Sequence, residues 1–236
     1  MAQYLHLFET ENEFTSAYTG ENYNEPWVSY TEETEKVDYN KYDPYNGYGH
    51  VDLGLPSGTI WATCNVGASS PEGYGGFFAW GETEPKSRYA GDSYIFSGAS
   101  DFTKYNSTDG KRVLDLEDDA AHVNMGGEWI MPTSAHCQEM FDNVTASWTT
   151  LNGVSGVMYT STVNGNTIFF PAAGMQVGNY REPSPTETRA SVWLSTLYPG
   201  EEYSANFLDG SVGRKTIDGQ ARWFGFPVRG IVPGSA

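Results

Sequence analysis

Hydrophobic residues occur along this 236-residue chain in short runs that are separated by glycine- and proline-rich turns. This pattern is typical of short β-strands and does not favour a helical bundle. The clearest case is the segment 50–67, HVDLGLPSGTIWATCNVG, which predicts two strands joined by a Pro-Ser-Gly turn. Apolar runs at 166–174, 191–198 and 223–231 predict further strands. The segment between the last two runs follows neither a helical nor a strand period, so we interpret it as irregular.

Two segments have the spacing and the end signals of short helices. Residues 116–126, LEDDAAHVNMG, predict a helix that stops at Gly126. Residues 129–144 contain the clearest helix start, because Thr133 follows a proline and is suited to cap the helix N-terminus ahead of an apolar face. Two helices among many short strands, with long loops between them, predict an α+β fold.

The beginning of the chain differs in composition from the rest. Residues 4–8 predict a short strand and residues 9–20 a helix, followed by a polar and acidic run. The segment 43–49, DPYNGYG, is dense in turn residues and suits a hinge. We expect residues 1–46 to be an N-terminal attachment arm and residues 47–236 to form one folded domain. The alternative stays open: an extra edge strand and helix that fold onto the main domain.

Charge excludes some classes of partner. The chain has 13 basic and 30 acidic residues, a net charge of −17, which argues against binding to nucleic acid or to an anionic membrane. Residues 1–50 hold ten acidic and two basic residues, whereas residues 192–236 hold four of each. No stretch approaches the roughly 20 apolar residues that cross a bilayer. The first residues lack the basic and apolar regions of a signal peptide, so we expect neither membrane insertion nor secretion by a standard signal.

Residue types that commonly carry chemistry form no recognisable site. Cys64 and Cys137 are either two buried thiols or one disulfide, and their spacing to histidine is not that of a zinc site. The four histidines fit no nucleophile–base or metal pattern. The acids at 117–119 are adjacent on a predicted helix start, where they suit capping better than calcium. No carboxylate pair stands out. We therefore expect no metal, no cofactor and no enzymatic activity.

The C-terminal segment 198–224 mixes aromatic, charged and small residues. Phe207, Val212, Ile217 and Val228 suit a core, but arginine, aspartate and glutamine would each need a partner if buried. Aromatic residues beside adaptable polar ones are typical of binding surfaces. This pattern predicts an exposed binding surface, with an ordinary strand-and-loop exterior as the alternative. The candidate ligand-binding residues are Tyr198, Glu201, Glu202, Ser204, Leu208, Arg214, Thr216, Asp218, Gln220, Ala221, Trp223 and Phe224.

Motifs in a fixed order also resemble a known family. They are VDLGLPSGTIWATCNVG, FFAWGETEP, LEDDAAHVNMGGEWIMPT, FFPAAG and GFPVRG, and they extend over about residues 48–231. They are similar to proteins of gut Bacteroidales and their phages. Those proteins have the C-type-lectin-like fold of the formylglycine-generating-enzyme lineage, in the branch called the Fibrobacter major paralogous domain. Some relatives are variable proteins of diversity-generating retroelements, whose last segment is rewritten at template adenines by a reverse transcriptase.

The resemblance implies a variable region at about residues 193–229, displayed on one face of a constant scaffold. EPK at 84–86 and EPS at 182–184 lack the third ligand of calcium-dependent lectins. Both cysteines lie upstream of the catalytic pair of the formylglycine-generating enzymes. Neither calcium-dependent sugar binding nor that enzymatic activity is therefore implied. The scaffold positions implied by the family are Trp193, Ser195, Leu197, Asn206, Phe207, Val212, Arg222, Gly225, Val228 and Arg229.

These observations lead to one functional hypothesis with two rivals. We expect a non-enzymatic phage or prophage protein, receptor-binding or tail-associated, that is located in the virion and acts outside the cell. Its partners would be a protein or glycan receptor on a bacterial surface and, through residues 1–46, other virion proteins. A homo-oligomer is compatible with this, since virion appendages are often multimeric. The rivals are a bacterial surface adhesin or glycan-binding module with a fixed tail, and an enzyme derived from the formylglycine-generating scaffold.

Overall fold

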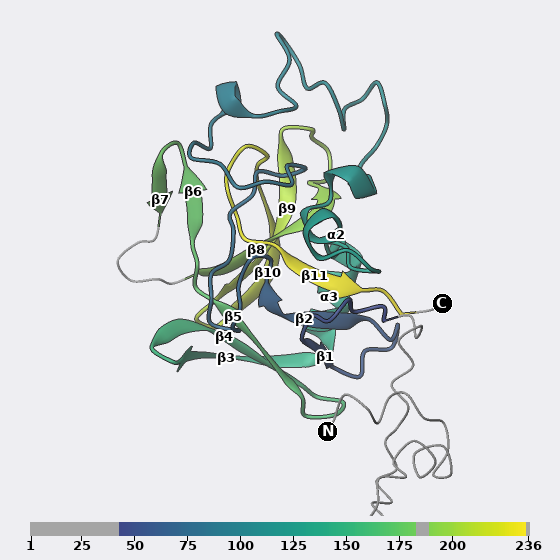
Figure 1. The fold of residues 1–236 in the computed structure, drawn as a ribbon, viewed down its shortest axis with the longest axis vertical. Helices are drawn as coiled ribbons and strands as arrows, with labels where there is room; N and C mark the ends of the chain where they lie inside the picture. Colours follow the sequence, from purple (N-terminus) through teal and green to yellow (C-terminus); the bar gives the residue numbers. More distant parts are fainter. Residues whose placement is uncertain (1–42, 183–188, 235–236) are drawn as a thin grey trace, which may run out of the picture. The chain divides into compact units, whose positions relative to one another are not determined.

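The computed structural model describes residues 43–182 and 189–234, and within these ranges it places eleven strands in small antiparallel sheets (Figure 1). The first sheet has the order β1-β2-β11 and joins the beginning of the described chain to its end. Its strands are β1 (His50–Asp52), β2 (Ile60–Asn65) and β11 (Arg229–Val232). The predicted hairpin at 50–67 is confirmed, because β1 and β2 pair antiparallel across the Pro-Ser-Gly turn.

The remaining sheets are built from hairpins. The sheet β10-β9-β8 carries most of the predicted variable region and consists of β8 (Arg189–Leu197), β9 (Ser204–Ser211) and β10 (Arg214–Ala221). A third sheet contains β3 (Val144–Leu151), β4 (Val154–Ser161) and β5 (Thr167–Pro171). A small hairpin pairs β6 (Met175–Val177) with β7 (Tyr180–Glu182).

Residues 204–221 form ordered β-structure, so the interpretation of this segment as irregular is wrong. β9 and β10 form a hairpin of two eight-residue strands in continuous register. Nearly all of β9 is buried, on both faces, and this removes the alternation of polar and apolar residues by which a half-exposed strand is detected.

The helices are short. α2 (Ala120–Met125) ends at Gly126, as predicted, and the Asp119 carboxylate caps its first turn by accepting from the amides of Ala121 and His122. α3 (Ser134–Asp142) begins at the predicted cap Thr133. Two short 3₁₀ turns, η2 (Gly91–Ser93) and η3 (Leu116–Asp118), lie in the loops before them.

The predicted α+β class is wrong. Of the described residues, 39% are in strands and 11% in helices, a β-rich fold. The prediction gave too much weight to two helix signals that produce helices of six and nine residues. It also missed the two hairpins β3–β4 and β9–β10.

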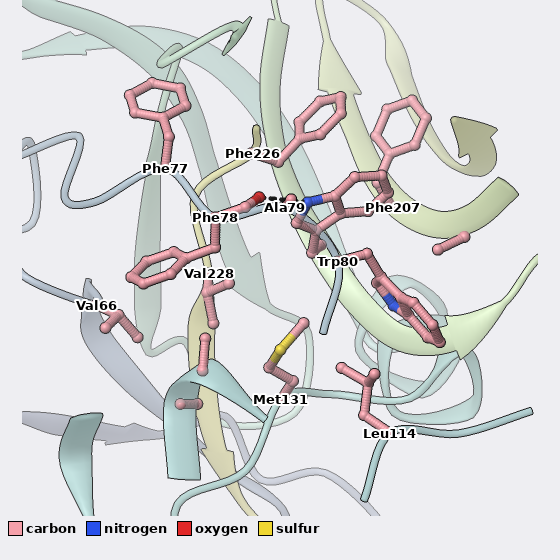
Figure 2. Packing of buried hydrophobic residues seen from close by; sticks show 14 of the residues in the cluster. Val66, Phe77, Phe78, Ala79, Trp80, Leu114, Met131, Phe207, Phe226 and Val228 are labelled. Atoms are coloured by element: carbon pink, nitrogen blue, oxygen red, sulfur yellow. Dashed lines mark hydrogen bonds between the residues drawn. The ribbon is translucent and has the colours of Figure 1, made fainter. Parts of the chain in front are cut away.

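Two clusters of buried side chains lie on opposite faces of the sheet β10-β9-β8. One cluster contains Trp193, Phe207 and Phe226, and Figure 2 shows its packing around Phe78 and Trp80. Trp193 donates its indole N–H to the carbonyl of Phe78 at 2.8 Å, which joins the sheet to the loop after β2. The other cluster contains Leu208 and Val192, together with residues of α3 and β4.

Arg229, one of the scaffold positions implied by the family resemblance, is fully buried. Its guanidinium donates to the Asn65 side chain at 2.8 Å and to the carbonyls of Ala62, Thr63 and Phe169. The same group stacks over the Phe170 ring, 4.5 Å from its centroid. Arg229 therefore ties β11 to β2 and β5 at the end of the described chain.

Residues 43–46 belong to the folded part of the chain. The Trp129 indole donates to the carbonyl of Tyr45 at 2.8 Å, and the Asn46 side-chain amide donates to the carbonyl of Met125 at 2.6 Å. The strand predicted at 4–8, the helix predicted at 9–20 and the rest of the proposed arm up to residue 42 lie outside the described residues.

The two cysteines are free thiols, Cys137 buried and Cys64 half-buried, so the disulfide alternative is wrong. Within 43–182 and 189–234, no helix is long and apolar enough to span a bilayer.

His136 makes the start of α3 sensitive to pH. Its Nδ1 accepts from the backbone amide of Thr133 at 3.2 Å, and its backbone amide donates to the Thr133 hydroxyl. Burial lowers the pKa of His136 below the usual value of about 6.5. Stability from neutral His136 is therefore present above about pH 6.5 and is lost as the pH falls through the lowered folded-state value.

We expect the free energy of unfolding to decrease between pH 7 and pH 5. Over this range the unfolded state binds at most about one more proton at this site than the folded state does, and this difference limits the decrease. The decrease should be smaller in His136→Gln, which keeps an acceptor at the third helical position but does not titrate. Urea unfolding at several pH values measures both. An identical pH dependence in the variant would mean that other groups cause it.

Candidate functional site

The structure divides the predicted binding residues between the two faces of the hairpin β9–β10. Successive strand residues point to opposite faces, and paired residues share one face. Ser204 pairs with Ala221, and Leu208 pairs with Ile217, on the face that meets α3. Ser204, Leu208 and Ala221 are buried there, so their predicted exposure is wrong. Leu208 packs against α3, and the small side chains of Ser204 and Ala221 are covered as well.

The opposite face of β10 presents a charged group of predicted residues. Arg214 donates to the Thr216 hydroxyl at 3.0 Å and lies 3.4 Å from the Asp218 carboxylate. It also lies 3.6 Å from Asp209, a buried carboxylate that Arg189 binds at 2.6 Å. This cluster is internally neutralised, with two cations and two anions, and it satisfies the buried charge of Asp209.

Other predicted residues lie at the edges of the sheet. The Tyr198 ring covers Gly219, where a Cβ would collide with it, so Tyr198 lies on the face opposite to Asp218. Arg112 donates to the backbone carbonyls of Tyr198 and Glu201. The half-buried Gln220 accepts from the amide of Ala221 through its own side chain. The predicted residues therefore do not form one continuous face.

Two of them, Glu202 and Trp223, meet at an open pocket of about 610 Å³. Its other wall comes from the segment 91–102, part of the long blue-to-teal loop region between β2 and α2 in Figure 1. Tyr203, which lies between Glu202 and the first residue of β9, completes the wall on the side of the sheet. Phe224, although adjacent to Trp223, packs against the core and does not line this pocket.

Aromatic rings form much of the pocket. The rings of Trp223 and Tyr203 meet edge to face, with centroids 4.5 Å apart and planes at 84°. Phe102 lies next to Tyr203, with a centroid distance of 6.5 Å. Gly91 lies against the indole, since a Cβ added there would be 3.8 Å from Trp223 Cδ2. Tyr203 is 53% exposed and Trp223 is half-buried, so both present aromatic surface to solvent.

The charged side chains of the lining are all acidic: Asp92, Asp101 and Glu202. Arg88, outside the lining, holds Asp92 through two hydrogen bonds of 2.5 and 3.0 Å. These bonds keep the pKa of the Asp92 carboxyl below its usual value. The Asp101 carboxylate accepts from the amide of Phe102 at 2.7 Å.

Beneath the pocket lies Arg222, which is fully buried and joins both of its walls. Its guanidinium donates to the carbonyl of Glu202 at 3.2 Å and to the carbonyl of Lys104 at 2.9 Å. It also binds the carbonyl of Tyr105 and the hydroxyl of Tyr94. The Phe102 ring covers the guanidinium at 4.2 Å. The family resemblance implied scaffold roles for Arg222, which is buried, and for Val212, which was also predicted to suit a core but is 68% exposed.

The pocket includes residues that the sequence interpretation did not select. Tyr203, between Glu202 and Ser204, is not among the predicted ligand-binding residues, although an exposed tyrosine is a common contact residue. The segment 91–102, GDSYIFSGASDF, is rich in glycine, serine and aspartate, which is a general loop signal. Nothing in that signal indicates that this loop meets the C-terminal segment.

The acidic run before α2 has a local structural role. Asp119 caps the helix, whereas Glu117 and Asp118 bind the ammonium group of Lys104. Asp115 lies 3.3 Å from the same ammonium. The carboxylates of Asp115, Glu117 and Asp118 converge at one point, and the Lys104 ammonium group occupies it.

Comparison of the chain with family models, curated proteins and solved structures finds no match. The family resemblance therefore stays a prediction.

Proposed function

We propose that the protein is a non-enzymatic ligand-binding protein whose ligand occupies the pocket between the segment 91–102 and the residues Glu202, Tyr203 and Trp223. One observation carries the proposal. Glu202, Tyr203 and Trp223 of the C-terminal segment meet the distant segment 91–102 around an open cavity lined by aromatic rings. The buried Arg222 binds backbone carbonyls on both sides of this cavity. Concave sites with aromatic walls and a few polar groups are the usual form of ligand pockets.

The lining favours binding over catalysis. It contains no cysteine, and no histidine or lysine in the lining could activate its serines, Ser97 and Ser100, as nucleophiles. Arg88 lowers the pKa of Asp92, whereas a general acid at neutral pH needs a raised one. The aromatic groups are of the kind that anchor protein and glycan ligands.

The biological role follows from this site and from the family resemblance. We propose a phage or prophage component that recognises a receptor on a bacterial surface, with residues 1–46 serving for attachment to other virion proteins. The pocket residues Glu202, Tyr203 and Trp223 fall inside the segment that the resemblance marks as variable. Changes there would alter the ligand, while the buried scaffold on both faces of the sheet stays constant.

Two exposed tyrosines provide a matched test of the pocket. Tyr203 lines it, whereas Tyr180 lies on the β6–β7 hairpin and is 78% exposed. Fluorescently labelled full chain would be measured by flow cytometry on a panel of gut Bacteroidales strains. On a strain that binds, Tyr203→Ala should weaken binding by about tenfold and Tyr180→Ala should leave it unchanged. Both variants should melt within about 2 °C of the unmodified chain.

Absence of binding to every strain, or loss of binding in Tyr180→Ala alone, would contradict the proposal. The neighbouring DNA separates the diversified form of this proposal from an adhesin with a fixed tail. A near-identical repeat of the tail sequence beside a reverse-transcriptase gene, differing mainly at adenines, is expected for the former.

A further inference from the structure

The pocket carries negative charge that the described part of the chain does not neutralise. Asp92 is bound by Arg88, but no described lysine or arginine forms an ion pair with Asp101 or Glu202. The backbone carbonyl of Glu202 accepts from Arg222, which fixes the point of the wall from which this side chain extends. Asp101 is likewise held in place at the opposite wall, through the amide of Phe102.

The aromatic walls add a second attraction for positive charge. Aromatic faces attract ammonium and guanidinium groups, because the ring quadrupole is negative on its face. Trp223 and Tyr203 stand nearly perpendicular, and Phe102 stands at 63° to Tyr203, so the rings form walls at steep angles and do not stack flat. Arg222 already shows this chemistry on the inner side, where its guanidinium lies 4.2 Å from the Phe102 centroid.

On these grounds we infer that the pocket accepts the cationic side chain of an arginine or lysine on a protein partner. The inference rests on the proposed function and specifies the chemistry of its ligand. A cation pairs with Asp101 and Glu202 and lies against the aromatic rings at the same time. A neutral sugar can donate hydroxyl hydrogen bonds to the two carboxylates but supplies no opposite charge. The net charge of −17 would also favour the approach of a basic partner.

Nuclear magnetic resonance titration of the ¹⁵N-labelled full chain tests the inference. The probes are Nα-acetyl-arginine methylamide, Nα-acetyl-lysine methylamide, the neutral isostere Nα-acetyl-citrulline methylamide, and methyl glucoside. The readout is the indole N–H signal of Trp223, assigned by its loss in Trp223→Phe. Both cationic probes should shift this signal saturably, and the two neutral probes should not.

Charge variants show whether the pocket or the overall charge attracts the probe. Glu202→Gln should weaken binding of the arginine probe by about tenfold, because a charge-assisted contact is lost. Asp142→Asn, at the end of α3 and outside the pocket lining, should leave it unchanged. Equal losses in the two variants would reveal nonspecific attraction and overturn the inference.

The remaining outcomes separate this inference from the proposed function. A shift with citrulline equal to that with arginine, or a shift with methyl glucoside alone, overturns the cation preference but leaves the pocket as a ligand site. No shift with any probe overturns the inference, while cell binding that depends on Tyr203 would still support the proposed function.

Discussion

Replacing Arg222 by methionine is expected to lower the free energy of unfolding by at least about 3 kcal/mol. The substitution removes the donors for three backbone carbonyls and the Tyr94 hydroxyl in a fully buried site. Each buried acceptor left without a partner costs about 1–3 kcal/mol. Since domains are stable by only about 5–15 kcal/mol, this loss is a large fraction of the total. Urea unfolding followed by tryptophan fluorescence measures it.

Two further variants locate the cause of this effect. Arg222→Lys keeps the charge but not the planar group of donors, so an intermediate loss is expected. Arg214→Met, which removes an arginine that is about half exposed on β10, should cost less than about 1 kcal/mol. If Arg222→Met unfolded at the same urea concentration as the unmodified chain, Arg222 would not be what holds the pocket walls together.

Replacing Trp223 by alanine is expected to weaken binding to receptor-bearing cells by about 30-fold or more, which corresponds to about 2 kcal/mol. The indole lines the pocket, meets the Tyr203 ring edge to face and lies against Gly91. Some stability should also be lost, because part of the ring packs against the core. Binding must therefore be measured at a temperature at which the variant is folded, as judged by circular dichroism.

Phe224→Ala is the matched control for this loss. Phe224 is the neighbouring aromatic residue, is also half-buried and packs against the same core cluster, but it does not line the pocket. Its truncation should reduce stability by a similar amount and leave binding within about threefold. Equal loss of binding in both variants would mean that Trp223 acts through the core and not through contact with the ligand.

Local signals in the sequence predicted several elements correctly. Thr133 caps α3, Gly126 ends α2, and the turn at 56–58 joins β1 to β2, because each of these depends on residues that are neighbours in the chain. The hairpin β9–β10 could not be detected in this way. β9 is buried on both faces and β10 is polar, so neither strand alternates.

The binding site shows the same division. Glu202 and Trp223 were selected because their residue types suit a surface, and both line the pocket. Leu208 and Ala221 are buried, contrary to the prediction, because the pairing of β9 with β10 turns both toward the face on which Leu208 packs against α3. The role of Arg222 depends on contacts with Lys104 and Tyr105, more than 100 residues away. Such pairing is set by the tertiary fold and has no local signature.

The central claim is that the ligand binds in the pocket lined by Glu202, Tyr203 and Trp223, and a substitution scan of the candidate residues and Tyr203 tests it most directly. For each variant displayed on cells, the amount of folded protein and the binding of receptor are measured separately. Substitutions at Glu202, Tyr203 and Trp223 should change binding while most of the protein remains folded. Substitutions at Leu208 and Ala221 should reduce the folded amount itself. A scan in which binding depends on Arg214, Thr216 and Asp218, and tolerates every change at the pocket positions, would contradict the account.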